Sequence, residues 1–553
     1  MNKVMKPLMT DVAVDPVTTE VVGSALMTIV EEMGKAIVRA AYSTNIKERQ
    51  DCSTVIFDTE GNTLAQAERI PVHLGSLLGI ADWVLKNTDL ATVRSGDVFI
   101  GNDAHTGGGT HLNDIVFLEP VFYEENLVAW VSNLAHHSDF VDRGHAHIYQ
   151  EGLRIPPVRL YRQGVLQQDI MDLVLLNCQV PQERINDFRA QMAANRLGVQ
   201  RYQALCDKYS EPVVRAAGAQ ILNYAERKTR AGISTIPDGI YTHECDFDTP
   251  SYDKILHLKV KVIVDKDEIT IDLRDNPEQV RAGINMVYTA TLATVYFAVK
   301  ALVDPDIPAN TGLHRPIHVI ADEGSVFNAV SPAAVYTRTD IGQRLVDMIF
   351  TALSAAVPER ICAACTGGGL MTFSGVHPRT GRFYVYNEMC GGSMGGRASQ
   401  DGLDGVQVHT TNTANIPVEA LEFEHPVMVE RYELVQDSGG AGKWRGGMTM
   451  RRKIRVLDHT ATVNAGGTNS IVAPWGLFGA QDGRTTQVEL GKNVAPLKNR
   501  NGLVPAGETL AMVASSGGGY GNPLDRDREL IKRDLKEERI SQKAAREIYG
   551  LDV

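Results

Sequence analysis

Two short segments of the sequence carry the side chains that could do chemistry. GGGTHLNDI contains His111 and Asp114, and NLAHHSD contains His136 and His137. Two imidazoles and one carboxylate form a ligand set used by catalytic zinc and by non-haem iron or manganese, with open positions for water or substrate. The alternative is a polar strand end with hydrogen-bonded histidines. The choice depends on whether the two segments meet in the fold.

The two segments lie at the open end of a predicted β-hairpin. The sequence predicts strands over 114–123 and 127–135, joined by a three-residue turn. With the strands paired across that turn, Asp114 faces His136, and directly paired side chains lie about 5 Å apart on one face of the ladder. The same alternation turns His137 to the opposite face. The predicted metal ligands are His111, Asp114 and His136.

Asp51 is a further candidate, either as a fourth metal ligand or as a catalytic base. It stands in KERQDCS directly before a predicted strand, as an acidic side chain at a strand end. An ion pair with Lys47 or Arg49 is an equally good interpretation of its position. His137 ranks below Asp51 as a catalytic candidate, because it points away from His136. Two weaker candidates, for which a helix-end or core role is the better interpretation, are Glu48 and His73.

The glycine clusters of the C-terminal half do not match a nucleotide-binding motif. In SGGAGKWRGG, Trp444 stands where a phosphate loop needs serine or threonine, and in MCGGSMGGR, Ser393 stands at a glycine position of the dinucleotide pattern. We expect these glycines to form tight turns between strands. The lone C-x-x-C of Cys362 and Cys365 has no second pair, so small buried residues are a better interpretation than zinc or redox chemistry.

The periodicity of the sequence predicts an α+β (mixed α/β) fold with several domains. Asp15 and Pro16 open a helix that should end near Ser43–Asn45, and residues 165–230 are mostly helical in pattern. The C-terminal half is richer in strands and in glycine, whereas the N-terminal half is helical and mixed. The expected domains are a mixed α/β metal-site domain (1–240), a central α/β domain (241–425), a β-rich domain (426–525) and a C-terminal helix (526–553).

Composition and charge restrict the function. The chain has 553 residues and a net charge of −12, which argues against a nucleic-acid partner. No segment approaches the roughly 20 apolar residues of a membrane span, and the N-terminal residues lack the features of a secretory signal. Seven cysteines are a sparse, odd number that fits a reducing compartment. We therefore expect a cytoplasmic protein with no membrane partner.

Taken in order, several segments resemble the hydantoinase B / oxoprolinase family. Besides the two segments above, the resemblance rests on IKERQDCSTVIFD, AERIPVHLGS, YQEGLRIPPVRLY, IPANTGLHRPIHVIA and SSGGGYGNP, and it covers nearly the whole chain. The family includes B-type subunits of N-methylhydantoinases and caprolactamase, part of 5-oxoprolinase, and subunits of acetone and acetophenone carboxylases. In its carboxylase branch the metal ligands are a His, an Asp three residues later and a second His, a spacing that His111, Asp114 and His136 match.

The resemblance implies a subunit and not a complete enzyme. An A-type partner with an actin-like ATPase fold binds ATP and magnesium and phosphorylates the substrate, while the B-type chain holds a divalent metal ion, zinc, manganese or iron. The first hypothesis is an ATP-dependent hydrolase of a cyclic amide, a lactam, hydantoin or oxoproline, in a hetero-oligomer such as a heterotetramer. The alternatives are a subunit of an ATP-dependent, biotin-independent carboxylase of ketones, and a non-catalytic, metal-stabilised scaffold subunit.

The sequence also departs from the family pattern beside the predicted site. The segment HHSDFVDRGHAHIYQEGL is shorter than in many members and lacks their glycine-proline-glycine-serine run. Asn113 stands where proline is common in the family. We expect these two changes to alter the choice of substrate.

Overall fold

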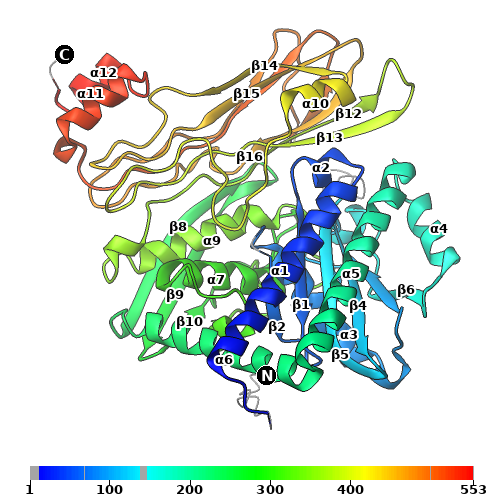
Figure 1. Cartoon of the computed structure of the whole chain (residues 1–553). Coiled ribbons are helices and arrows are strands. Elements are labelled where there is room, and N and C mark those ends of the chain that lie inside the picture. Colours follow the sequence, from blue (N-terminus) through cyan, green and yellow to red (C-terminus); the bar gives the residue numbers. More distant parts are fainter. Residues whose placement is uncertain (1–11, 68, 138–145, 499, 552–553) are drawn as a thin grey trace.

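The computed structural model describes residues 12–67, 69–137, 146–498 and 500–551. Within these ranges the chain forms four β-sheets together with helices, which confirms the mixed α+β fold. Figure 1 shows an N-terminal region in blue and cyan, a central region in green, and layered β-sheets in yellow to red above both. The last two helices lie at one end of these layers.

The first sheet has seven strands and carries the segments with the predicted ligands. Its strand order is β2 (Thr63–Gln66), β1 (Cys52–Phe57), β5 (Asn126–His136), β4 (Asp114–Tyr123), β3 (Val98–Gly101), β6 (Val158–Arg162) and β7 (Val165–Leu166). The surrounding helices are α1 (Pro16–Ala40), α2 (Thr44–Lys47), α3 (His73–Asn87), α4 (Gln168–Leu176), α5 (Pro181–Tyr209) and α6 (Glu211–Ile233). The Asp15 side chain caps α1 as predicted, although the helix ends at Ala40, a few residues before the expected end.

Helices cover both faces of this sheet, so its strands are buried on both sides. Val116 and Leu118 of β4 pack into the apolar cluster around α3, whereas Ile115 and Phe117 pack into the cluster that contains Phe188 of α5. Successive side chains of a strand point to opposite faces. The even-numbered residues of β4 therefore face α3, and the odd-numbered residues face α5.

The second sheet begins at β8 and belongs to the central region. Its strand order is β11 (Ile317–Ile320), β10 (Glu268–Asp272), β9 (Tyr252–Asp265) and β8 (Gly239–Thr249). The helices of this region are α7 (Tyr288–Val303), α8 (Thr311–His314) and α9 (Arg338–Ala352). Helix α9 contacts β8 and β9, and its first turn reaches the open end of the β4–β5 hairpin through Arg338.

The third and fourth sheets pack face to face over a shared apolar core. The third has the order β13 (Phe383–Met389), β12 (Gly369–Val376), β16 (Ala461–Gly467) and β18 (Asn501–Val504). The fourth has the order β14 (Val427–Leu434), β15 (Met450–Val456), β19 (Thr509–Val513) and β17 (Gln487–Leu490), with α10 (Val418–Glu424) beside β14. Strands from both sides of residue 425 share the third sheet, and the division into four domains stays a prediction.

Glycines of the C-terminal half allow backbone segments to pack directly against each other. A Cβ atom on Gly446 would lie 2.0 Å from the carbonyl oxygen of Gly517, and one on Gly395 would lie 2.0 Å from that of Ala363. Neither glycine has the positive φ of a tight turn. The expectation of tight turns is therefore wrong at these positions, where glycine is required because any side chain would collide with backbone.

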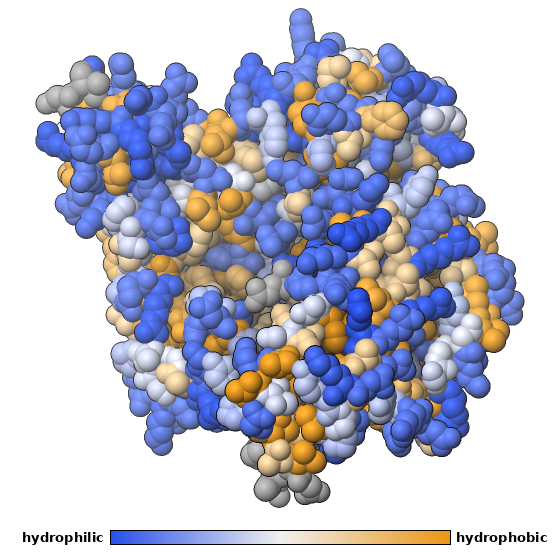
Figure 2. Space-filling model, in the orientation of Figure 1, coloured by the Kyte–Doolittle hydropathy of each residue, from blue (hydrophilic) through white to orange (hydrophobic). Residues whose placement is uncertain are grey.

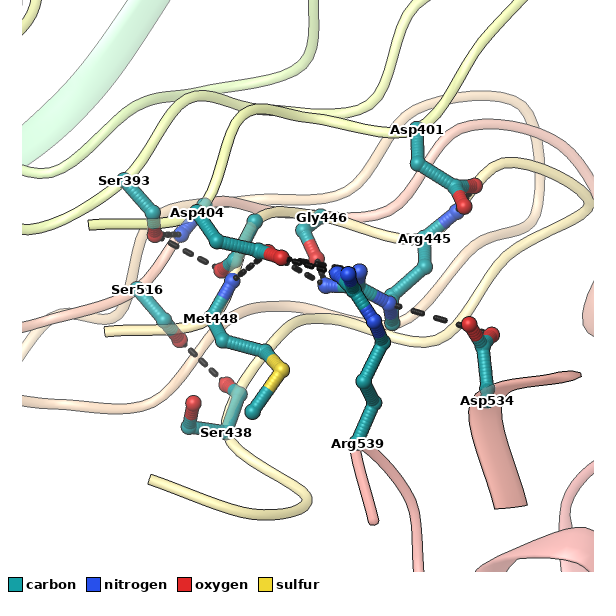
Figure 3. A network of polar contacts seen from close by, with 12 residues as sticks. Ser393, Asp401, Asp404, Ser438, Arg445, Gly446, Met448, Ser516, Asp534 and Arg539 are labelled. Atoms are coloured by element: carbon teal, nitrogen blue, oxygen red, sulfur yellow. Dashed lines mark hydrogen bonds and ion pairs between the residues drawn. The ribbon is translucent and has the colours of Figure 1, made fainter. Parts of the chain in front are cut away.

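A network of charged side chains attaches α11 (Arg528–Lys536), and the segment that leads from it to α12 (Gln542–Glu547), to the glycine-rich loops (Figure 3). Nη1 of Arg445 lies 2.9 Å from Oδ1 of Asp404, and Asp404 also accepts the N–H of Met448 at 2.7 Å. Arg526 pairs with Asp534 of α11 at 2.6 Å. Buried charges of this kind are tolerated only when they are paired, so the network fixes where the chain end lies.

Polar side chains cover most of the face of the molecule that Figure 2 shows, with apolar side chains in smaller groups between them. Among the described residues, no helix is both long and apolar enough to cross a membrane.

Candidate metal centre

The β4–β5 hairpin places Asp114 opposite His136, as the sequence predicts. The two residues form the pair at the open end of the ladder, on the face that α3 covers. At the closed end Tyr123 pairs with Asn126, so the turn has two residues where the pattern predicted three. A β-bulge next to the turn shifts the register by one residue and restores the predicted pairing along the rest of the ladder.

His111 completes the group from the turn before β4. Its Nδ1 lies 3.0 Å from Oδ2 of Asp114, and its ring centroid is 5.0 Å from that of His136. The N–H of Asp114 donates to the carbonyl oxygen of His111, which closes the turn. One ligand atom from each residue lies within 4.8 Å of the other two. We call His111, Asp114 and His136 the three-ligand group.

Three polar neighbours hold Asp114 in place. Nη2 of Arg338 donates to its Oδ2 at 2.9 Å, and the hydroxyls of Ser76 and Thr110 donate to the same oxygen at 3.2 and 3.3 Å. Burial disfavours the charged carboxylate, but His111 and Arg338 outweigh burial and hold the pKa of Asp114 well below its usual range. Asp114 is therefore an ionised, fully buried carboxylate at neutral pH.

The remaining carboxylate oxygen of Asp114 indicates that the group fits a cation. Oδ1 is buried and has no hydrogen-bond partner among the described residues. A buried anionic oxygen without a partner is costly, so such an atom calls for an explanation. A divalent ion bound beside it would satisfy the oxygen, and imidazole with carboxylate suits zinc, manganese or iron.

Each histidine of the group has a ring nitrogen that could bind a metal ion. Burial, and after it the charge of Arg338, lowers the pKa of His111 to about 3. Nδ2 of Asn45 lies 3.2 Å from Nδ1 of His136 and donates to the His136 carbonyl oxygen at 2.7 Å. An amide N–H can only donate, so Nδ1 of His136 accepts and is the ring nitrogen whose lone pair could bind a metal, while Nε2 carries the proton. Neutral imidazole is the form that binds metal ions.

A cavity of about 90 Å³ opens beside the three-ligand group. Its lining comes from all three regions of the fold and includes His73, Arg338, Asp340, Asn387 and Arg500. Arg49 lines the same cavity and donates to the carbonyl oxygen of Asn387 at 2.8 Å. Small-molecule sites often form where structural units meet, and the lining includes the guanidinium groups of three arginines together with the carboxyl groups of Asp51 and Asp340.

Asp51 lines the cavity but lies outside the three-ligand group. Its Oδ1 is 3.4 Å from Nε2 of His73, and Nδ1 of that ring lies 2.9 Å from the hydroxyl oxygen of Ser53. The observed ion-pair partner of Asp51 is therefore His73, and not Lys47 or Arg49, the two partners considered from the sequence. Burial lowers the pKa of His73. The carboxylate and the imidazole form a fixed pair at the cavity wall.

His137 lies on the opposite face of the sheet from His136, as the alternation predicts. Its Nε2 is 3.0 Å from Oε1 of Gln191, its Nδ1 is 2.8 Å from Nη1 of Arg184, and its ring packs on Phe188 at 5.3 Å. All three partners belong to α5. Burial, and after it Arg184, lowers the pKa of His137 to about 3. These contacts place His137 away from the cavity.

Comparison with known proteins assigns the family. A family model described as hydantoinase B/oxoprolinase matches residues 15–523. The chain belongs to this family. The resemblance predicted from the sequence is therefore confirmed, and it extends over both the metal centre and the β-sheet layers.

Two relatives of this family member match it along nearly their whole length. A protein of Pseudomonas sp. (strain NS671), named as the putative B-type subunit of a D-/L-hydantoinase, is 33% identical, over 98% of this chain and 95% of its own. The beta subunit of the caprolactamase of Pseudomonas jessenii is 30% identical, over 97% of this chain and 96% of its own.

Solved structures confirm the fold. The crystal structure of ATP-dependent caprolactamase from Pseudomonas jessenii superposes with a TM-score of 0.89 at 29% identity, over 98% of this chain and 97% of that chain. The nucleotide-free structure of acetone carboxylase gives a TM-score of 0.86 at 17% identity, over 98% of this chain and 80% of that chain. At that identity the second match shows the shared fold alone.

Several residues of this hydantoinase B/oxoprolinase site were not found from the sequence. Arg338 reaches Asp114 across 224 positions of the chain, and Arg500 enters the cavity from the strand-rich C-terminal half. Neither lies in a motif that predicts its neighbours, so only the fold brings them to the site. Asn45 was the one missed residue that the sequence could have indicated, because it lies close in sequence to Asp51, which was already a candidate at a strand end.

Three features singled out from the sequence contribute less to the described site. Glu48 is the C-cap of α2, which supports the helix-end interpretation. Asn113 donates to the carbonyl oxygen of His137 at 2.8 Å and accepts its N–H at 2.8 Å, so it extends the pairing beyond the ladder. The shortened segment after His137 falls largely on residues 138–145, which lie outside the described residues.

Proposed function

We propose that this chain is the metal-containing B-type subunit of an ATP-dependent cyclic amide hydrolase. Its substrate would be a lactam, hydantoin or oxoproline that a partner ATPase subunit has phosphorylated. Support comes from the family and from two relatives whose names describe subunits of a hydantoinase and of a caprolactamase. The partner that we infer is an A-type subunit with an actin-like ATPase fold, which binds ATP and magnesium in a hetero-oligomer such as a heterotetramer.

One observation carries this proposal: the three-ligand group and three guanidinium groups meet at one cavity. Guanidinium groups bind phosphate oxygens with high geometric specificity. The arginines Arg49, Arg338 and Arg500 therefore suit a substrate that already carries a phosphoryl group.

Different residues of the site would carry out different parts of the proposed reaction. Amide resonance makes the ring carbonyl a poor electrophile, and phosphorylation of its oxygen provides a leaving group. When bound, a divalent ion at the three-ligand group would supply Lewis-acid polarisation of an oxygen. Asp51 is placed to accept a proton from the water that attacks the activated ring carbon, and His73 orients that carboxylate. The carbon–nitrogen bond of the ring then breaks, the nitrogen takes up the proton and leaves as an amine, and a second water hydrolyses the resulting acyl phosphate to a carboxylate and phosphate. We assign His137 a packing role on the other face of the sheet.

The test is an assay of the chain co-purified with an A-type partner subunit. ATP-dependent phosphate release is measured with caprolactam, 5-oxoproline and hydantoins as substrates. We expect His136→Ala and Asp51→Asn to lower kcat by at least about 100-fold. His257→Gln is the matched control, because His257 is an exposed histidine on β9 and its loss should leave the rate unchanged.

Two outcomes would replace the proposal. Bicarbonate-dependent carboxylation of a ketone, with no cyclic amide opened, would identify the complex as a carboxylase. Full activity in the His111→Ala, His136→Ala double variant would instead reduce the chain to a scaffold subunit.

A further inference from the structure

A second cluster of metal-ligand residues lies apart from the cavity described above. Ligand atoms of Asp347, Cys365 and His409 all lie within 4.8 Å of one another. Sγ of Cys362, which is not part of this three-residue group, lies 3.7 Å from Sγ of Cys365, so the two sulfurs of the C-x-x-C motif are neighbours. Asp347 belongs to α9 and lies nine residues after Arg338, which corresponds to about 13 Å along the helix axis.

The sulfur separation fits two thiolates on one metal ion. Zinc binds sulfur at about 2.3 Å, and two ligands of a tetrahedron at that bond length lie about 3.8 Å apart. The 3.7 Å between Cys362 and Cys365 matches this edge, whereas a disulfide needs about 2.0 Å. The spacing C-x-x-C is also that of structural zinc sites, although one pair supplies only two ligands. The fold supplies the remaining two.

The other two ligands come from α9 and from the loop that follows β13. Nε2 of His409 lies 2.8 Å from Oδ1 of Asp347. This separation is about 0.5 Å shorter than the edge of a zinc tetrahedron with bonds of about 2.0 Å, so a small outward shift would admit the ion. His409 has φ of 51°, a left-handed backbone that is uncommon for residues other than glycine and that fixes where its ring points.

The surroundings of the cluster complement thiolates and a cation. The backbone N–H of Gly395 donates to Sγ of Cys365 at 3.3 Å, and such a contact stabilises a negative sulfur. Nη1 of Arg344 lies 3.2 Å from Oδ2 of Asp347. Two thiolates and one carboxylate carry three negative charges, which a divalent ion and the Arg344 guanidinium would balance. The charges of the buried site would then be compensated.

Burial makes the cluster a closed site. Cys362, Cys365 and Asp347 are buried, and the edges of Phe297 and Phe350 pack against the His409 ring. A metal with four protein ligands and no access for substrate has a structural role. Thiolates favour zinc among the common divalent ions.

We infer that Cys362, Cys365, His409 and Asp347 bind a structural zinc ion. The ion joins α9 to the C-x-x-C loop, which packs against the glycine-rich segment at Gly395. Because Arg338 at the start of α9 holds Asp114, the zinc ion indirectly supports the geometry of the three-ligand group. This inference is independent of the substrate and of the reaction proposed above.

The first test measures the metal content and the cobalt spectrum of the full-length chain. The His111→Ala, His136→Ala double variant lacks two ligands of the first site, and it should still retain about one equivalent of zinc. Replacing that zinc with cobalt should give sulfur-to-metal charge-transfer absorption and the intense visible bands of tetrahedral cobalt. In this background, Cys362→Ser with Cys365→Ser should abolish both the metal and the bands. Cys206→Ser removes a buried cysteine of α5 and should change neither.

A second measurement keeps the inference testable even if the cysteine variants do not fold. X-ray absorption at the zinc edge of the His111→Ala, His136→Ala variant should show sulfur scatterers at about 2.3 Å. A zinc shell of nitrogen and oxygen alone, a disulfide between Cys362 and Cys365, or less than about a tenth of an equivalent of metal would each overturn the inference.

Discussion

Asp114 and His136 are directly paired across the β4–β5 ladder, and their side chains share the face of the sheet that α3 covers. Because of this pairing, two residues at opposite ends of the hairpin sequence lie next to each other in the fold. It also explains why the neighbouring His137 takes no part, since the next residue of a strand points to the other face. The three-ligand group is therefore a consequence of strand register together with the single turn that adds His111.

The first prediction concerns metal binding. His111→Ala, Asp114→Asn and His136→Ala each remove one donor of the three-ligand group, and each should weaken the affinity for manganese or zinc by more than about 100-fold. Titration calorimetry measures this on a chain whose cysteine-containing site is saturated beforehand and whose three-ligand group holds no metal. His318→Gln changes a half-exposed histidine of β11 and should leave the affinity unchanged. Equal affinities in all four variants would remove the group from consideration as a metal site.

The second prediction concerns the buried ion pair between Arg338 and Asp114. Arg338→Met leaves Asp114 as a buried carboxylate without its guanidinium partner, which should lower the free energy of unfolding by about 3–5 kcal/mol. Adding Asp114→Asn removes the charge as well and should restore much of that loss. Urea denaturation of the metal-free single and double variants measures the coupling. Purely additive effects would show that the two side chains do not depend on each other.

The third prediction concerns the base at the cavity wall. In the complex with the A-type subunit, Asp51→Asn should lower kcat with little change in KM, because the amide keeps the shape of the carboxylate but cannot accept the proton. His73→Gln should have a smaller effect, since His73 acts through Asp51. Steady-state phosphate release separates the two parameters. A rise in KM alone for Asp51→Asn would assign Asp51 to substrate binding.

The fourth prediction is a pH dependence of stability that arises from Glu119 of β4. Burial raises the pKa of this carboxyl to about 7 from an ordinary value of 4.5. The folded pKa lies above the unfolded one, so the stability due to the protonated form is complete below pH 4.5 and is lost as the pH rises through about 7. Glu119→Gln should therefore stabilise the chain by on the order of 2 kcal/mol at pH 8, and by much less at pH 5.

Thermal unfolding at the two pH values measures this difference. Glu125→Gln changes an exposed residue of the hairpin turn and serves as the control. Equal stabilisation by Glu119→Gln at pH 5 and pH 8 would mean that the carboxyl does not titrate in this interval.

Local patterns in the sequence predicted that His111, Asp114 and His136 lie together, because Asp114 and His136 are paired in one hairpin and His111 lies in the turn before it. That they bind a metal ion stays a prediction. The predicted turn was one residue too long, and the register was nevertheless correct at the ligands because a bulge made up the difference. Arg338 and Arg500 were beyond reach, since their contacts with the site depend on how three regions of the fold pack together. For the same reason the sequence did not predict the zinc site that we infer at Cys362 and Cys365, because the other two residues of that site lie on other segments.

Glycine was the residue type whose role the sequence pattern misjudged, and this leads to the last prediction. Gly446→Ala would place a Cβ atom 2.0 Å from the carbonyl oxygen of Gly517, where the neighbour is backbone and cannot rotate away. We expect a loss of stability of more than about 3 kcal/mol, or no folded protein. Gly342→Ala in α9 is the matched control, because its nearest neighbour would be Oγ1 of Thr294 at 3.4 Å. That change should be neutral or stabilise the helix by up to about 1 kcal/mol. Chemical denaturation compares the two variants, and a Gly446→Ala protein as stable as Gly342→Ala would show that the glycine-rich segments do not need close backbone contact.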